Sequence, residues 1–123
     1  MDIQLLAFPD KDDADLLCAV AALTASLQER GAGVTADVGQ WVDRQPDVIH
    51  ALGVEAAQIA LDASPRVPVV VSFDADEPDA PRERVVARRA DALLVTSTGE
   101  RRAWMRVGVP AACVHVWHLP ADI

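Results

Sequence analysis

Six short apolar runs, most of them continuous, divide the chain at fairly regular intervals. Strands that are buried on both faces have this composition in parallel sheets, whereas a strand with one wet face alternates apolar and polar residues. The pattern therefore predicts a parallel sheet. The expected strands are Ile3 to Phe8, Val34 to Val38, Val48 to Ala51, Val67 to Phe73, Ala92 to Thr96 and Val114 to Trp117.

Helical periodicity separates most of these runs. Ser97 and Glu100 have the spacing of a capping box at the start of the last expected helix. Alternation of strand and helix indicates an α/β fold with right-handed crossovers: a Rossmann-like, doubly wound sheet in three α/β/α layers. The expected helices run from near Asp13 to Gly31, from Val54 to Asp62, from Pro81 to Ala90, and from Ser97 to Gly108.

One connection interrupts this alternation. Only GQWVDRQP separates the second strand from the third, barely enough for a helical turn, so we expect a short helix around Trp41 there. A parallel sheet of five to six strands in the order 2-1-3-4-5-6 accommodates the short link and has its switch point between strands one and three. Ligands of such sheets bind at the carboxyl ends of the strands. The candidate ligand-binding residues there are Asp10, His50, Gly53, Asp74, Ser97 and Thr98.

Length and charge narrow the classes of function. A chain of 123 residues fits one domain, 1–123, with one core. The formal charge of -8 argues against a nucleic-acid partner, because binding to a phosphate backbone needs a basic footprint. The acids lie mainly before Pro81, and the segment from Arg82 onward carries 7 arginines against 4 acids. Solvated helix faces account for those arginines.

The cysteines and the N-terminus bear on the cellular compartment. Cys18 and Cys113 are predicted to be small buried residues, since neither a disulfide framework nor metal-ligand spacing is present. We therefore expect no metal site. The run MDIQLLAF lacks the basic start of a signal peptide and the length of a transmembrane segment. These features favour a cytoplasmic protein.

From Pro46 onward the chain resembles a known family. PDVIHALG, VPVVVSFD, ARRADALLVTSTGERRAWMRVGVP and VHVWHLPADI follow one another in the order typical of the N-terminal, acceptor-side domain of the retaining GT-B glycosyltransferases of family 4. The resemblance implies that the nucleotide-sugar donor is bound by a second Rossmann domain and that transfer occurs between the two domains. It therefore implies no cofactor in this chain, no sugar transfer by the chain alone, and a role as a binding or interaction module or as part of a larger glycosyltransferase.

Two candidate catalytic residues follow from the resemblance. His50 matches the first histidine of the family's HAH-type motif, but Leu52 stands at the second. Asp74 replaces the family's histidine that contacts the donor sugar, and a carboxylate is not a neutral proton donor at its usual pKa. The acidic loop FPDKDDADL, which has no glycine, would repel a diphosphate. We expect His50 to have a structural role through a backbone carbonyl, and Asp74 to be close to neutral for both binding and stability.

Other functions remain open on the sequence. A receiver-like signalling domain would explain the acids after the first strand, but the third strand ends in His50 and Ala51 instead of a phosphoacceptor aspartate. A flavodoxin-like domain would need a hydroxyl-rich loop at that place. The family resemblance implies that VHVWH would lie beside a partner domain, so Trp117 and an open sheet edge are expected to favour self-association or a protein partner in the C-terminal strand region.

Overall fold

The computed structural model describes residues 1–8, 14–63, 66–73 and 81–116. They form one parallel sheet of six strands in the order β2-β1-β3-β4-β5-β6, which confirms the predicted order and the switch point between β1 and β3. The strand bounds lie within two residues of those expected from the apolar runs. They are β1 Asp2–Ala7, β2 Gly33–Val38, β3 Val48–Leu52, β4 Val69–Ser72, β5 Ala92–Val95 and β6 Val114–Val116.

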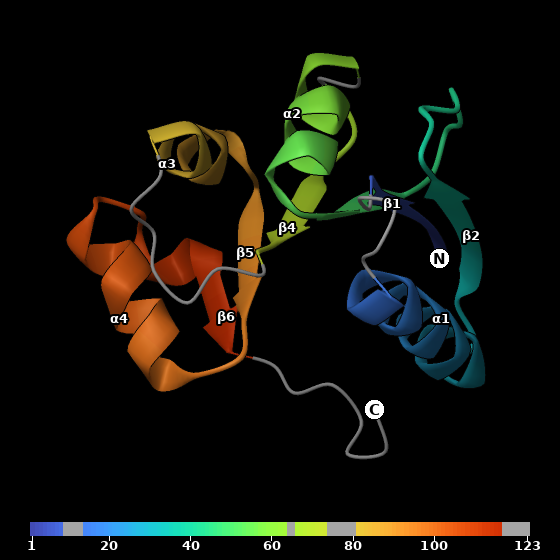
Figure 1. The fold of residues 1–123 in the computed structure, drawn as a ribbon, viewed down its shortest axis with the longest axis horizontal. Coiled ribbons are helices and arrows are strands. Elements are labelled where there is room, and N and C mark those ends of the chain that lie inside the picture. The colour runs from blue at the N-terminus through green and yellow to red at the C-terminus, as the bar shows by residue number, and fades with distance from the viewer. Residues whose placement is uncertain (9–13, 64–65, 74–80, 117–123) are drawn as a thin grey trace.

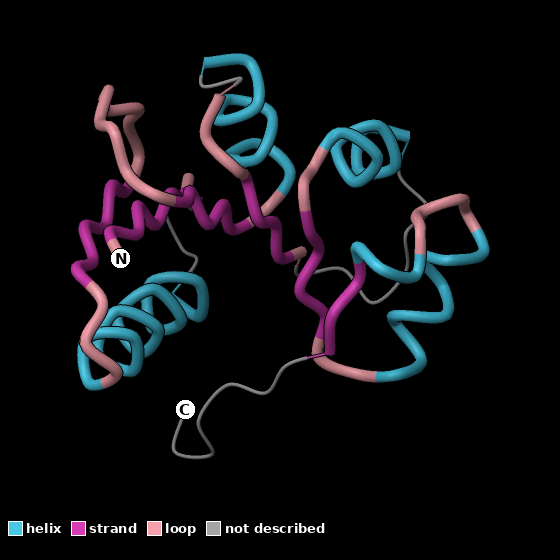
Figure 2. Tube along the Cα trace, turned by 180° about the vertical axis from the view of Figure 1, so that it is seen from behind, coloured by secondary structure: helices cyan, strands magenta, loops and turns pink. Residues whose placement is uncertain are grey.

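Helices cover both faces of the sheet, in three layers (Figure 1). Helix α1, Ala14–Glu29, packs on β1 and β2 from one side. Helices α2, Val54–Ala63, α3, Pro81–Arg89, and α4, Thr98–Arg106, lie on the other side, and a 3₁₀ turn, Ala111–Cys113, leads into β6. Seen from behind, α1 stands apart from the other three helices, across the sheet from them (Figure 2). The fold is therefore the doubly wound α/β arrangement that the sequence predicts.

The core is divided by the sheet in the same way. On the side of α2 to α4 it contains residues such as Leu6, Ile49 and Trp104, and the Trp104 ring stacks on Phe73 with a centroid distance of 5.0 Å. On the side of α1 a smaller cluster joins Leu5, Ala7, Val20, Leu23 and Leu52. Alternate residues of β1 enter different clusters, as expected for a strand that is buried on both faces.

The connection between β2 and β3 differs from the expectation of a short helix around Trp41. Residues 39–46 form an irregular loop instead, which begins at Gly39 with a positive φ of 76°. The carbonyl of Val42 accepts a hydrogen bond from the Gln4 side chain, and Arg44 is ion-paired with Asp37. Side chains of the sheet therefore hold this loop, and the segment needs no helical hydrogen bonds of its own.

The prediction that both cysteines are buried is wrong for Cys18, which is exposed, whereas Cys113 is half-buried. Cys18 lies on α1 two residues before Val20, and this offset of about 200° turns it away from the buried face of the helix. No helix of the described residues is long and apolar enough to span a membrane.

Candidate functional site

The predicted site lies along one edge of the sheet, where the strands end. The registers place Ala7 beside Leu52, Leu52 beside Ser72, and Ser72 beside Leu94. The carboxyl ends of β1, β3, β4 and β5 therefore meet, as the parallel topology requires. His50, Gly53, Ser97 and Thr98 lie at or near this edge, whereas Asp10 and Asp74 lie outside the described residues.

Gly53 forms the turn from β3 into α2. Its φ of 96° lies in the left-handed region, which favours glycine over residues with a Cβ. Its amide donates to the carbonyl of Ser72 at 2.8 Å, and its carbonyl accepts from the amide of Ala57 at 3.1 Å. Gly53 thus joins β4 and the first turn of α2 at the switch point. These contacts explain the glycine without a ligand.

His50 lies on the face of β3 that also carries Leu52, away from α2 to α4. Its Nε2 lies 2.8 Å from the Ser72 hydroxyl on the neighbouring strand. Burial lowers the pKa of His50 from 6.5 to about 4, so the imidazole is neutral near pH 7. A neutral, buried imidazole that is paired with a hydroxyl across two strands contributes to the packing of the sheet and presents no charge to a ligand.

Ser72 was not anticipated as the partner of His50, for which we expected a backbone carbonyl. The two residues are 22 positions apart. Only the register that places Leu52 beside Ser72 brings them onto the same face of neighbouring strands. An alternating polar position inside an apolar strand is the one sequence signal for such a pairing.

The start of α4 confirms half of the predicted capping box. The Ser97 hydroxyl accepts a hydrogen bond from the amide of Glu100 at 3.1 Å. The Glu100 carboxylate, however, reaches Thr96 instead of the Ser97 amide, with contacts of 2.9 Å to the Thr96 hydroxyl and 3.3 Å to its amide. This carboxylate places a negative charge at the positive end of the helix dipole. The arrangement favours capping over anion binding at Ser97 and Thr98.

A second polar cluster, which the sequence did not reveal, lies over β1 and β2. Gln4, a residue with no exposed surface, donates from Nε2 to Asp37 Oδ2 at 2.9 Å and to the carbonyl of Val42 at 3.0 Å. Arg44 donates from Nε and Nη2 to the two oxygens of Asp37, at 2.9 and 3.0 Å. Hydrogen bonding from Arg44 is the main cause of the lowered pKa of Asp37; the Gln4 contact acts in the same direction and burial opposes both.

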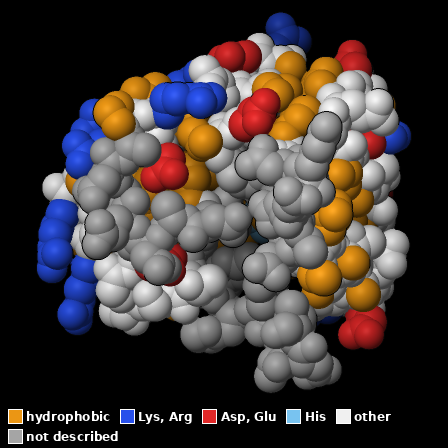
Figure 3. All heavy atoms as spheres, in the orientation of Figure 1, with side chains coloured by type: hydrophobic (Ala, Val, Ile, Leu, Met, Phe, Trp, Pro, Cys, Tyr) orange, Lys and Arg blue, Asp and Glu red, His pale blue; other side chains and the backbone are white. Residues whose placement is uncertain are grey.

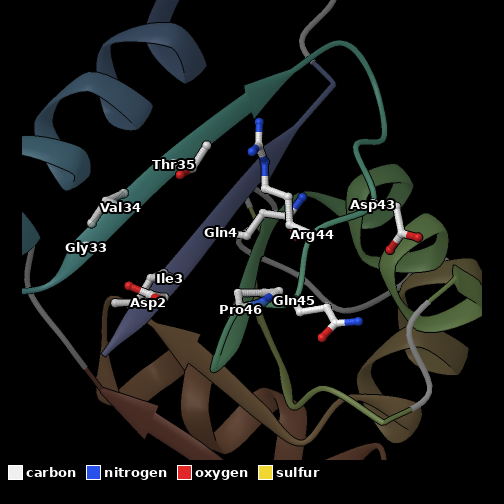
Figure 4. Close-up of a pocket in the computed structure, with 10 residues that line it drawn as sticks. All are labelled: Asp2, Ile3, Gln4, Gly33, Val34, Thr35, Asp43, Arg44, Gln45 and Pro46. Atoms are coloured by element: carbon white, nitrogen blue, oxygen red, sulfur yellow. The ribbon is translucent and has the colours of Figure 1, made fainter.

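This cluster borders a hollow of about 550 Å³ between the two strands and residues 43–46. Figure 4 shows the Arg44 side chain lying over β1 beside Gln4. Both partners of Gln4 Nε2 are acceptors, which fixes the orientation of the amide. Its Oε1 is buried and finds no donor among the described residues, a position suited to an ordered water. The cluster fastens the loop to the sheet at the place where other crossovers of this fold carry a helix.

The described residues contain no group of three histidine, cysteine or acidic side chains that could hold a metal ion. Among the described residues, this edge carries the hydroxyl groups of Ser97 and Thr98 and the Glu100 carboxylate, with the neutral imidazole of His50 buried beneath it. Such groups suit hydrogen bonding to a polar ligand.

Comparison with protein families gives one match: the profile described as "Glycosyl transferase 4-like domain" covers residues 14–120. Comparison with curated protein sequences gives no match. The matched segment includes α1 and β2, so the family pattern begins well before Pro46.

Solved structures agree with this match at the level of the fold. Anabaena HepE, crystallised with UDP and glucose, superposes with a TM-score of 0.66 at 17% identity, over 97% of this chain and 44% of that one. UDP-GlcNAc 2-epimerase from Methanocaldococcus jannaschii gives 0.66 at 8% identity, over 94% and 45%. The chain thus spans less than half the length of these two proteins.

A third structure is similar over nearly its whole length. The response regulator TrrA of Thermotoga maritima, in complex with Mg²⁺ and BeF, gives a TM-score of 0.56 at 13% identity, over 87% of this chain and 96% of that one. At such identities the likeness shows a shared doubly wound sheet and not a shared chemistry.

Proposed function

The chain belongs to the glycosyl transferase 4-like family, and from this membership we propose that it is the acceptor-side half of a GT-B glycosyltransferase, inactive in sugar transfer alone. The observation that carries the proposal is the extent of the match. The family profile covers residues 14–120, whereas the superposition with HepE covers 97% of this chain and only 44% of that protein. We place the donor site in the part of such an enzyme that this chain does not cover.

The chemistry of the carboxyl edge supports a binding role over a catalytic one. His50 is buried and neutral, and Glu100 already lies against the start of α4. Stabilising the departing diphosphate of a nucleotide-sugar needs cationic or amide donors aimed at the developing charge. We propose that this edge contributes hydrogen-bonding groups to an acceptor and that a second domain supplies the groups for the diphosphate.

The partner in this arrangement would approach from the β6 side. β6 has three residues, ends the sheet, and leaves Val116 39% exposed. An edge strand with an exposed apolar side chain is suited to a protein partner. Trp117, the aromatic residue expected to take part, lies outside the described residues.

A receiver-like function has less support, despite the likeness to TrrA. β3, with the sequence VIHAL, contains no carboxylate that could accept a phosphoryl group. The superposition therefore reports the common sheet order alone.

Turnover tests the proposal directly. The chain is incubated with UDP- and GDP-sugars and a panel of sugar and polyol acceptors, and release of the nucleoside diphosphate is followed by a coupled assay. A full-length two-domain glycosyltransferase serves as the positive control. We expect release at the rate of the enzyme-free blank; multiple turnovers by this chain alone would contradict the proposed role.

A further inference from the structure

Strand β2 lies at one edge of the sheet and pairs with β1 alone among the described strands. The amide of Gly33 donates to the carbonyl of Met1 at 2.9 Å, and that of Gly39 to the carbonyl of Ala7 at 2.8 Å. In a strand, the backbone amide and carbonyl of successive residues point to opposite sides. The backbone groups of the odd-numbered residues from 33 to 39 therefore point toward β1. The amides and carbonyls of Val34, Ala36 and Val38 therefore face outward.

This edge carries few of the features that usually keep edge strands apart, and its one inward-pointing charge is neutralised by an ion pair. Its six residues, GVTADV, contain no proline and no lysine, and it pairs with β1 without a bulge. Its one charged residue, Asp37, is 5% exposed and is held by Gln4 and Arg44 on the inner side of the sheet. Val38, by contrast, is 40% exposed. Such an edge is a template for another strand.

Helix α1 flanks the same edge with an uncharged surface. No charged residue occurs between Leu17 and Gln28, although Leu17 is 47% exposed and Cys18, Ala21 and Ala25 are also exposed. In Figure 3, orange side chains extend over the right side of the molecule, where α1 and β2 lie. A helix that is apolar on its outer face as well as its inner face is usually covered.

The other helices show the contrast. α3, with the sequence PRERVVARR, and α4, TGERRAWMR, each have arginine at three or more positions. Their outer faces are those of solvated helices. Val85 on α3 and Met105 on α4 are also exposed, but arginines flank them, and α2 exposes Glu55, Gln58 and Asp62. A long uncharged outer face is thus found on the helix beside the open edge, so two adjacent features point to one interface.

We propose that this surface, the β2 edge together with the outer face of α1, pairs with a second copy of the chain about a twofold axis. The two β2 strands run antiparallel and join two sheets into one. Antiparallel hydrogen-bonded pairs need outward-facing residues opposite each other. Centring the pairing on Ala36 satisfies this requirement, with Val34 of each copy opposite Val38 of the other.

The same axis brings the two α1 helices together. Both lie on one face of the joined sheet, and each packs over the outermost strands β1 and β2. Paired strands lie about 4.8 Å apart, so helices that sit a few ångströms inside each edge approach the usual interaxial distance of about 8–10 Å. Small side chains such as Ala21 and Ala25 permit this approach. A second copy supplies the same small, uncharged surface, whereas an unrelated partner has no reason to match it.

The size and charge of the contact define the expected strength of the dimer. A contact about 20 Å long on the strand and about 18 Å along residues 17–28 of the helix places the interface near the lower end of specific interfaces. Each copy carries a formal charge of -8, but the outward-facing residues Val34, Ala36 and Val38 and residues 17–28 of α1 include no charged side chain. Salt that screens the repulsion between the copies should therefore strengthen the dimer.

Sedimentation velocity between about 5 and 500 µM at low and high salt tests the proposal. Ala36→Pro removes an outward-facing amide, and the edge strand of a sheet tolerates proline. Val38→Lys places a charge on the strand part of the proposed interface, and Ala21→Lys places one on the helix part. The matched control is Val116→Lys at the opposite edge, with circular dichroism to confirm folding of each variant. We expect a salt-strengthened dimer that weakens at least tenfold in the first three variants and persists in the control. A monomer at 500 µM, or a dimer lost only in the control, would overturn the proposal.

Discussion

Acidification is expected to destabilise this domain through one buried imidazole. His50 is 6% exposed, and burial lowers its pKa from 6.5 to about 4 in the folded chain. The unfolded chain therefore binds a proton more readily than the folded chain between these two values. The neutral, buried His50 therefore contributes its full stabilisation of the folded state above pH 6.5. This contribution is lost as the pH falls from 6.5 to 4.

The size of this loss follows from the shift in the pKa of His50. Each pKa unit corresponds to about 1.36 kcal/mol, so a shift from 6.5 to about 4 corresponds to about 3 kcal/mol of unfolding free energy. For a domain with a total stability of about 5–15 kcal/mol, that is a large fraction. The effect should be visible well before the domain unfolds in acid.

Urea unfolding at a series of pH values from 7.5 to 4 measures this loss of unfolding free energy, with the fluorescence of the buried Trp104 as one probe. His50→Gln keeps a polar group near Ser72 but does not titrate. Because the carboxylates titrate in both proteins, the difference between their pH slopes isolates His50. Exposed His115 provides the control His115→Gln. Equal pH slopes for His50→Gln and the parent chain would refute the burial argument.

Two further substitutions test the polar contacts of the described residues. Asp37→Ala leaves Arg44 without its ion pair and Gln4 Nε2 with one acceptor fewer; we expect a loss of about 1–3 kcal/mol in urea unfolding, and no loss would show that the cluster does not hold the loop. Ser97→Ala removes the hydroxyl that accepts from the Glu100 amide; we expect a loss of about 1 kcal/mol in the same assay, and weakened ligand binding at unchanged stability would instead support a ligand role.

The sheet could be predicted from the sequence because its signals are local. Continuous apolar runs indicated parallel strands, and the short GQWVDRQP link indicated the strand order, which the structure confirms. The prediction of a helix around Trp41 was wrong because side chains outside the loop, and not hydrogen bonds within it, determine its conformation. Gln4, which lies on β1 and 38 positions before Val42, binds the Val42 carbonyl and also Asp37, the residue that holds Arg44.

The position of the candidate residues in the fold was predictable, but their contacts were not. The rule that parallel sheets bind ligands at their carboxyl edge located His50 and Gly53 correctly near the switch point. The Ser72 hydroxyl beside His50 could not be predicted, because it depends on the register between β3 and β4. The exposure of Cys18 depends in turn on the rotation of α1 about its axis.

Binding of a nucleotide-sugar is the most direct test of the central claim, that the chain is an acceptor-side half without a donor site. Isothermal titration calorimetry of the isolated chain with UDP-glucose and a panel of UDP- and GDP-sugars measures it, with a full-length two-domain glycosyltransferase titrated in parallel. We expect no saturable heat for this chain at ligand concentrations that saturate the full-length enzyme. Saturable binding in the micromolar range by the chain alone would contradict it.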